Sequence, residues 1–393
     1  MDIVHYLEPY KPIRTTIPGI SQEESLAERV SFFGGGEDWF RNANFQIVII
    51  GVPESRNGAD NRGCDAAPNQ IRRWLYAHRG DNLDVTIGDA GNVLGKSIND
   101  RYHALSDVIT YFRNLKSIVV VLGGSQDLSM PIFKALKGIS DNVNLVAADA
   151  MLDVDVANED FSSRSWLSHL VADYATSLSN LSVIGIQNYI VSGSQEGFVT
   201  NRFFEILRLG QIRGNDIDKT EVPLRDAHFF SFDFRVIKEQ PQIMDEVLSP
   251  HGLEPHEACR ICRYAGMGEQ INVFGLFDVP GSKSELKNND LLAAQLVWHF
   301  IEGLAGRFGD YPNRSIDAYK YYVVPFEGED PGLEFFHNQE NGRWWMRVPA
   351  DNGSVVMACS RDDYRKALKK EYPDRWWRSF MRRMPVTKDI TNC

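Results

Sequence analysis

Two aspartates four residues apart are the first feature of the sequence that points to chemistry. Asp149 and Asp153 lie in AADAMLDVD, residues 147–155, directly after an apolar run, with Met151 between them. Carboxylates at this spacing are typical of metal sites, and a histidine between them would complete the pattern. The sequence therefore leaves two alternatives, a metal site that does chemistry or a catalytic fold that has lost its chemistry.

Three further stretches place polar residues at the ends of apolar runs. Gln126 follows a Gly-Gly pair, Ser-Phe-Asp-Phe-Arg ends in Asp233 and Arg235, and Phe277 and Asp278 precede Val-Pro. Residues two apart on a strand face the same side, so we expect Arg235 to point where Asp233 points. A guanidinium stays charged at every accessible pH and offers no acceptor, so it cannot ligate a cation.

Short apolar runs alternate with amphipathic stretches before residue 310. The runs are continuously apolar, which is typical of strands covered on both faces, and the amphipathic stretches have helical spacing. The runs occupy residues 45–53, 117–124, 143–150, 181–188, 228–234 and 271–279, and the amphipathic stretches residues 69–78, 101–115 and 289–304. This alternation predicts an α/β fold with a mostly parallel sheet between helices, in which ligands bind beyond the carboxyl ends of the strands.

The amino-acid composition of the sequence changes near residue 310. The chain after this point is rich in aromatic residues and turn signals, and it ends in a basic segment. We therefore predict an α/β domain over residues 1–310 and a C-terminal extension over residues 311–393 that packs on or beside it. Ser360 and Asp363 have the spacing of a capping box, which predicts the start of a helix at Ser360.

Composition narrows the class of protein. The net charge of −11 disfavours nucleic-acid binding, and five cysteines scattered over 393 residues favour a reducing cytoplasm over a disulfide framework. The single CxxC, Cys259 to Cys262, lies in a helix-like pattern and is interpreted as core. The first residues show no apolar signal region, and no apolar stretch reaches the ~20 residues of a membrane helix. We expect a cytoplasmic protein without a transmembrane segment.

The order and spacing of these motifs resemble those of the ureohydrolase family, which comprises arginases, agmatinases and formimidoylglutamases. The resemblance rests on the stretches around Gln126, Asp149, Asp233 and Asp278, together with residues 51–75, and it covers about residues 45–305. The Arg-Trp-Trp pieces of the C-terminal part are similar to those of formimidoylglutamase-like proteins of Bacteroidetes. The resemblance implies a three-layer α/β/α fold, and family members commonly form trimers or hexamers.

The resemblance also implies a site for two manganese ions, held by six side chains. Carried over by position, this chain keeps Asp149, Asp153 and Asp233 as ligands. The other three ligand positions hold Gln126, Met151 and Arg235.

A family glutamate that helps bind the guanidinium-type group of the substrate aligns with Phe277. Asp278 next to it would be a shifted substitute, but in an extended chain it would point differently from residue 277.

We interpret these residues as a vestigial site that holds no manganese and catalyses nothing. A thioether is too soft to replace a histidine on manganese, and the charge of Arg235 repels a cation. Aspartates without a cation repel one another, and a guanidinium pairs well with carboxylates, so Arg235 would stand in for the metals. The resulting hypothesis is a pseudoenzyme that serves as a structural or regulatory protein-interaction partner, through contacts with another protein or by self-association.

Four alternatives stay open. In the first, the aspartates are loop residues that only cap helices. In the second, a single magnesium or calcium ion binds the aspartates together with the Gln126 carbonyl. Metal-dependent hydrolysis of C–N bonds would be retained, with formimidoylglutamate as the natural candidate substrate. His169 and His228 would be relocated ligands, although neither falls in a ligand motif of the family.

The basic C-terminal segment predicts an amphipathic helix. Residues 360–384 contain nine Lys/Arg and four Asp/Glu, so this segment carries +5 and the remainder −16. Trp376, Trp377, Phe380, Met381 and Met384 form one apolar stripe, with arginines opposite. We expect Trp376 and Trp377 to be buried within the same chain or its oligomer, with Trp344 and Trp345 in the receiving surface. Peripheral membrane contact through residues 374–384 and docking into a partner's groove are the alternatives.

Overall fold

The computed structural model divides the chain into two compact units. The first unit contains Met1–Glu196 and Leu207–Arg307, and the second contains Gly197–Ile206 and Phe308–Cys393. The structure describes residues 3–41, 44–59, 63–155, 160–238, 250–281, 288–312, 319–326, 329–350 and 353–383. Within these ranges, none of the helices combines the length and the apolar character needed to cross a membrane.

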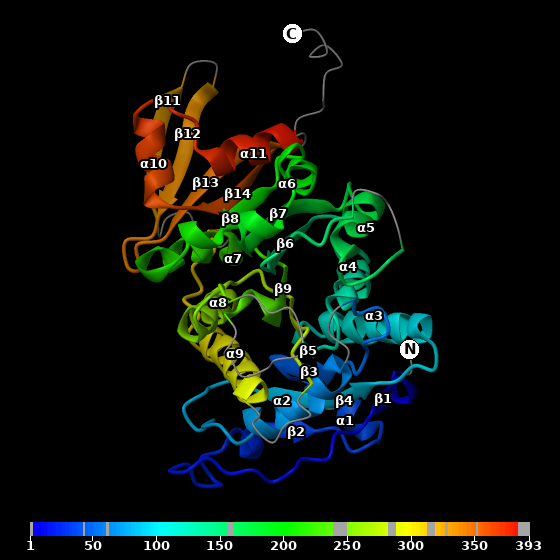
Figure 1. Cartoon of the computed structure of the whole chain (residues 1–393). Helices are drawn as coiled ribbons and strands as arrows, with labels where there is room; N and C mark the ends of the chain where they lie inside the picture. Colours follow the sequence, from blue (N-terminus) through cyan, green and yellow to red (C-terminus); the bar gives the residue numbers. More distant parts are fainter. Residues whose placement is uncertain are drawn as a thin grey trace. The chain divides into compact units, whose positions relative to one another are not determined.

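A ten-stranded, mostly parallel sheet forms the centre of the first unit (Figure 1). The strand order is β1-β4-β3-β5-β10-β9-β6-β7-β8, and β2 pairs in addition with β4. The strands are β1 (Leu7–Glu8), β2 (Val30–Phe32), β3 (Ile47–Gly51), β4 (Ile87–Val93), β5 (Ile118–Leu122), β6 (Val143–Ala148), β7 (Leu178–Ile186), β8 (Glu205–Arg208), β9 (Phe229–Asp233) and β10 (Val273–Phe277). All six apolar runs of the sequence form strands, as predicted.

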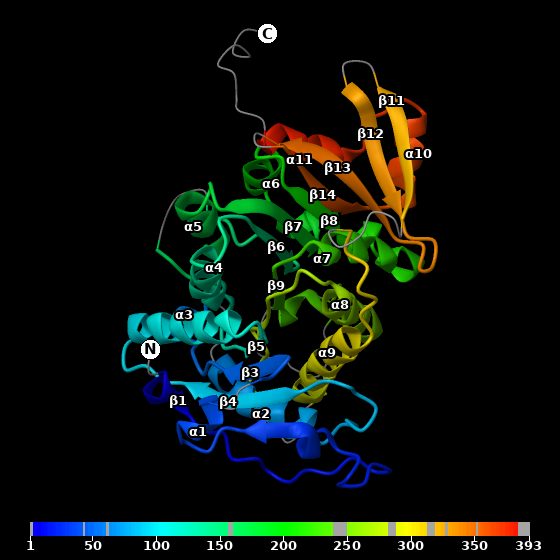
Figure 2. The same cartoon turned by 180° about the vertical axis from the view of Figure 1, so that it is seen from behind.

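Helices cover both faces of this sheet, which gives the expected three layers. Figures 1 and 2 show α3 and α4 on one side and α8 and α9 on the other. The helices are α1 (Asp38–Arg41), α2 (Ala67–Leu75), α3 (Ile98–Asn114), α4 (Ser129–Lys137), α5 (Trp166–Asp173), α6 (Gly193–Thr200), α7 (Glu221–Arg225), α8 (Pro255–Met267) and α9 (Asn288–Ala305). The three amphipathic stretches of the sequence correspond to α2, α3 and α9.

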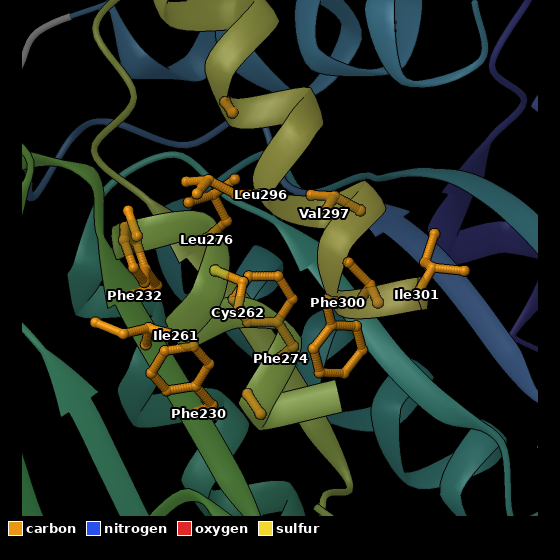
Figure 3. Close-up of a cluster of buried hydrophobic side chains, with 14 of the residues drawn as sticks. Phe230, Phe232, Ile261, Cys262, Phe274, Leu276, Leu296, Val297, Phe300 and Ile301 are labelled. Carbon is orange, nitrogen blue, oxygen red and sulfur yellow. The ribbon is translucent and has the colours of Figure 1, made fainter. Parts of the chain in front are cut away.

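The core between the sheet and helices α8 and α9 contains stacked phenylalanines among aliphatic side chains (Figure 3). Phe230 of β9 stacks on Phe274 of β10 with ring centroids 5.4 Å apart, and Phe274 stacks on Phe300 of α9 at 4.7 Å. Cys262 of α8 is fully buried in the same cluster, as the core interpretation of the CxxC predicted. This packing fixes β9 and β10, whose carboxyl ends carry polar residues.

The second unit contains a four-stranded antiparallel sheet with two helices. The strands, in the order β11-β12-β13-β14, are β11 (Lys320–Phe326), β12 (Glu329–His337), β13 (Trp344–Ala350) and β14 (Gly353–Cys359). Helices α10 (Arg361–Leu368) and α11 (Asp374–Arg383) follow. Ser360 caps α10 through the predicted capping box with Asp363, and α11 begins immediately after Pro373. Side chains of both helices share one core with the sheet.

Candidate functional site

Four neighbouring strands bring the sequence-predicted site residues together. β5, β10, β9 and β6 are adjacent and parallel, so their carboxyl ends meet at one edge of the sheet. Gln126 follows β5, Asp149 follows β6, Asp233 ends β9 and Asp278 follows β10. The turn after β5 requires glycine, because a side chain at position 124 would collide with the backbone of the loop after β3.

Asp149, Asp153 and Asp233 form one buried group, which we call the carboxylate cluster. One oxygen of each lies within 4.8 Å of the others. Asp149 accepts a hydrogen bond from the backbone N–H of Met151 at 2.9 Å, and Asp153 accepts one from the indole N–H of Trp166 at 3.1 Å. Oδ1 of Asp153 is buried and has no hydrogen-bond partner in the described part of the chain. Three acidic groups this close need donors, a proton or a cation between them.

The amide of Gln126 lies among the three carboxylates. With Nε2 turned towards them, it is 2.9 Å from Asp153, 3.1 Å from Asp149 and 3.2 Å from Asp233, while Oε1 accepts from the Ser231 hydroxyl at 3.2 Å. The opposite orientation would direct the amide oxygen at acceptors only, so hydrogen bonding selects the first orientation. An amide has two N–H donors, so it cannot serve three carboxylates at once.

Arg235 supplies positive charge at one side of the cluster. Its Nε donates to both oxygens of Asp233, at 3.0 and 2.9 Å, and its terminal nitrogen lies 3.4 Å from Asp278. The sequence predicted a hydrogen bond between Arg235 and the aspartates, and the Asp233 contact confirms it. The route differs from the prediction, because β9 ends at Asp233 and a 3₁₀ turn, Phe234–Val236, brings Arg235 back to Asp233.

Met151 faces a second guanidinium. Nη1 of Arg164 contacts the Met151 sulfur, and the charge of Arg164 also acts on Asp153. The thioether is therefore engaged by a cationic donor of the same chain. Each of the three altered ligand positions therefore involves a hydrogen-bond donor. Gln126 and Arg235 are donors themselves, and Met151 is contacted by Arg164.

Asp278, and not Phe277, reaches into the site. Phe277 is fully buried, and its ring fills the space beside Gly123 and Gly275. The chain is not extended at the next residue, because Asp278 has a φ of 53°, a left-handed conformation that is uncommon for aspartate. This turn directs its carboxylate to the backbone N–H of Gln126, at 3.0 Å, and to Arg235.

Burial raises the pKa of three acidic residues in this site, Asp149, Asp153 and Asp278. Burial and the charges of Asp153 and Asp233 hold the pKa of Asp149 well above its ordinary value. Burial also raises the pKa of Asp153 to about 6 and that of Asp278 to about 8, with Arg235 opposing both shifts. Burial and the repulsion between neighbouring carboxylates therefore both favour the protonated form of Asp149.

Burial by itself would lower the pKa of Arg235, but the charges of Asp233 and Asp278 outweigh it and raise that pKa well above its ordinary value.

These side chains do not fit the two-manganese site that the family resemblance implies. The three carboxylates are suitable ligands, but the neighbouring groups are an amide N–H, a thioether and a guanidinium. Manganese takes oxygen and imidazole donors, and a cation placed here would compete with Arg235 for Asp233. The donor set suits internal hydrogen bonding better than metal binding.

Residues 45–302 of this chain match the arginase family. This stretch covers most of the first unit and includes every residue of the site. The chain belongs to the arginase family. The resemblance of its motifs to ureohydrolases is thereby confirmed.

Relatives of this arginase-family chain include formimidoylglutamases. One of Macrococcus caseolyticus is 22% identical over 237 residues, which cover 56% of this chain and 72% of that protein. A Trypanosoma cruzi formiminoglutamase solved with Mn²⁺ has a TM-score of 0.60 and 21% identity, and the match covers 67% of this chain and 95% of that one. Proclavaminate amidino hydrolase of Streptomyces clavuligerus gives a TM-score of 0.56 at 16% identity, with coverages of 66% and 92%. The solved structures show the shared fold.

The two histidines considered as relocated ligands lie outside the carboxylate cluster. His228 precedes β9, accepts a hydrogen bond from the backbone N–H of Asn144, and has its pKa lowered to about 4 by burial. His169 lies on α5 with its ring against Phe161. Among the described residues, the group that offers three metal-type ligands is the three aspartates.

The C-terminal tryptophans correct one expectation. Trp344 and Trp376 belong to the core of the second unit, and Trp345 is buried beside Tyr319. Trp377 is 42% exposed, so the expectation that it is buried within the same chain is wrong, whereas its burial in an oligomer stays a prediction. Trp376 and Trp377 are adjacent on a helix and point about 100° apart, so one apolar surface buries only the first.

Arg375 and Arg378 both pair with Glu205, as expected for arginines that meet acidic residues. Met384, also assigned to the apolar stripe, lies outside the described residues.

Two residues of the site were not predicted from the sequence. Arg164, in the chain before α5, contacts Met151, and Trp166, the first residue of α5, contacts Asp153, each 13 residues further on. They belong to none of the quoted motifs, and only tertiary folding brings them to the cluster. The one available signal was the arginine itself, a cation close in sequence to two aspartates.

Proposed function

We propose that this arginase-family chain is a pseudoenzyme that acts as a structural or regulatory protein-interaction partner. One observation carries the loss of catalysis, namely that donors of the same chain engage the groups where the family places metal ligands. The Gln126 amide faces the carboxylates, the Arg235 guanidinium binds Asp233, and Arg164 contacts the sulfur of Met151.

The hydrolysis expected of the family needs a water molecule activated by metal. A guanidinium cannot be deprotonated in a protein, so it can neither activate water as a base nor ligate a metal. The positive charge that a metal would bring to Asp233 is already present in Arg235. These properties favour a site whose charges are satisfied internally and which has no nucleophile to offer a substrate.

The alternative is a metal-dependent C–N hydrolase of the formimidoylglutamase type. Two observations favour it. Relatives carry that name, and the three aspartates still lie within 4.8 Å, with one buried oxygen of Asp153 that accepts no hydrogen bond from the described residues. In this case a metal would have to displace both the amide and the guanidinium.

Hydrolase assays separate the two functions. The full chain, loaded with excess manganese, is incubated with formimidoylglutamate, arginine and agmatine beside a sample stripped of metal by chelator. The proposal expects equal, background product formation in both samples. Turnover that depends on manganese would contradict the proposal and support the alternative.

The interaction role is tested through the exposed indole of α11. Trp377 is 42% exposed, whereas the other three candidate tryptophans are buried, so it is the candidate that a partner can contact. The full chain and its Trp377→Ala variant are used as baits in extracts of the native organism, with Phe308→Ala as a matched control at another exposed aromatic residue. We expect a partner that Trp377→Ala loses and Phe308→Ala keeps. Equal recovery with all three baits would remove Trp377 from the interface.

A further inference from the structure

A cavity of about 460 Å³ lies in the first unit beyond the carboxyl end of β7. Ile186, the last residue of β7, forms part of its wall together with the loop that follows, the Leu209–Gln211 turn after β8 and His251. It is separate from the carboxylate cluster, since none of the cluster's aspartates lines it. Its volume falls in the range of small-molecule sites, which is about 300–1,000 Å³.

Two arginines line this cavity, and each is oriented by an acidic residue outside the lining. Arg208 binds the Glu196 carboxylate and donates to the side chain of Asn188 at 2.5 Å. Arg213 lies 3.4 Å from Glu254, a longer and weaker contact. Neither glutamate is among the described residues that line the cavity. A guanidinium has five N–H donors, so both arginines keep donors for an anion in the cavity.

The remaining wall combines apolar and aromatic side chains with three amides, those of Gln187, Asn188 and Gln211. Ile186 and Leu209 are buried and form apolar wall, and the rings of Tyr189 and His251 meet edge to face at 6.4 Å. The Tyr189 hydroxyl donates to Gln187, whose amide donates to the backbone of His251 at 3.0 Å, so the aromatic side is fixed by hydrogen bonds. Fixed walls reduce the ordering that a ligand must impose on binding.

We propose that this cavity binds a small organic anion with an apolar body, its carboxylate or phosphate head paired with Arg208 and Arg213. The apolar and aromatic wall would hold the body, and the two guanidiniums would hold the head. The inference does not depend on whether the carboxylate cluster is catalytic. The backbone N–H of Gln187 donates to Ala150 at 3.0 Å, so the cavity wall is also joined to the loop that carries Asp149 and Asp153.

Five probes test both halves of the ligand. Binding of 3-phenylpropanoate and phenyl phosphate to the full chain is measured by calorimetry and by the shift in Tm. The neutral 3-phenylpropan-1-ol tests the body alone, and acetate and inorganic phosphate test the heads alone. We expect at least one of the two phenyl anions to bind at least tenfold more tightly than the alcohol and than its own free head. Preference between the two identifies the head group.

Variants locate the binding. Arg208→Met with Arg213→Met should weaken the preferred probe at least tenfold, whereas Arg79→Met, at an exposed arginine outside the cavity, should not. Gly210 lines the cavity, and a Cβ there would meet no atom within 4 Å, so Gly210→Leu should add an obstructing side chain at the cavity without disturbing the fold. Gly36→Leu, at another open glycine, is its control.

Three results would overturn the proposal. The first is that neither phenyl anion binds at millimolar concentration. The second is that the alcohol or a free head binds as tightly as the phenyl anions. The third is that Gly210→Leu, shown to be folded by its unchanged circular dichroism, binds the probe as well as the parent chain does.

Discussion

Asp149, Asp153 and Asp233 are held together by hydrogen-bond donors of their own chain. Gln126 serves the centre of this cluster and Arg235 one side of it, so the arginine is not the sole replacement for a cation. Sequence reasoning identified the altered positions because each changes the chemical type of a ligand. It could not find the central place of the amide, because glutamine reads equally as acceptor or donor until its neighbours are known.

Replacing Arg235 tests its role at this scale. Arg235→Ala leaves the fully buried Asp233 without its cationic partner. Removing one member of a buried ion pair lowers the free energy of unfolding by about 3–5 kcal/mol. Denaturant unfolding measures this loss, and Arg41→Ala, at an exposed surface pair, should change little. Equal effects of the two variants would show that Arg235 is not part of the structure's electrostatic balance.

The raised pKa of Asp278 predicts how the free energy of unfolding depends on pH. Its pKa of about 8 in the folded chain lies above the ordinary value of 3.8, so between these values the folded state keeps a proton that the unfolded state has lost. Stability from this group is therefore complete below about pH 4 and is lost as pH rises towards 8, by at most about 1.4 kcal/mol per pH unit.

Asp278→Asn should flatten this slope in chelator-treated protein unfolded at a series of pH values. Asp81→Asn is the control, because the hydrogen bond from Arg79 lowers the pKa of Asp81 and places its titration below the window. A slope that Asp278→Asn leaves unchanged would assign the pH dependence to other groups.

Apolar runs and helical spacing predicted six of the ten strands of the sheet in the first unit, together with helices α2, α3 and α9. β4 was missed, because its sequence, IGDAGNV, has polar residues where the other strands are apolar. Its Asp89 binds Arg72 of α2 in a fully buried ion pair, and Asn92 accepts from the same arginine at 2.6 Å. Because buried polar residues of β4 are paired with an arginine, the strand lacks the apolar pattern by which strands are predicted.

Trp376 is the main side chain that packs helix α11 against the rest of the second unit. Trp376 is 1% exposed, stacks on Tyr372 and Phe380, and donates to the backbone of Arg347 at 3.0 Å. Trp376→Ala should destabilise the second unit by about 3–5 kcal/mol. Thermal unfolding of Trp376→Ala and Trp377→Ala compares a buried with an exposed indole, and the second should lose less than a third as much. Equal losses would show that Trp377 is buried in solution, for example by self-association.

The division of the whole chain was only partly visible in the sequence. The change in composition near residue 310 falls close to Phe308, where the second unit resumes. Nothing in the composition indicated that Gly197–Ile206 belongs with it. The reason is visible in single contacts, since Glu205 pairs with Arg375, and Arg382 lies over the ring of Phe204. Such long-range contacts are encoded in complementary charges and shapes and leave no local pattern.

The proposed loss of catalysis combines a family fold with a site whose charges are balanced from within. The family assignment rests on residues 45–302, and fold alone does not determine activity. Metal binding is the property in which a pseudoenzyme and a metal-dependent hydrolase differ most. It depends on the carboxylate cluster, Gln126, Met151 and Arg235 together, so it reports on the whole account and not on one substitution.

Manganese stoichiometry tests this account most directly. The full chain, purified without chelator, incubated with excess manganese and freed of unbound metal, is measured by elemental analysis beside a Gln126→His, Met151→His, Arg235→Asp triple variant. We expect well under two manganese ions per parent chain, and more in the triple variant if the surrounding residues still support the ligands. Two tightly held manganese ions per parent chain would contradict the account and assign the site to a metal-dependent enzyme.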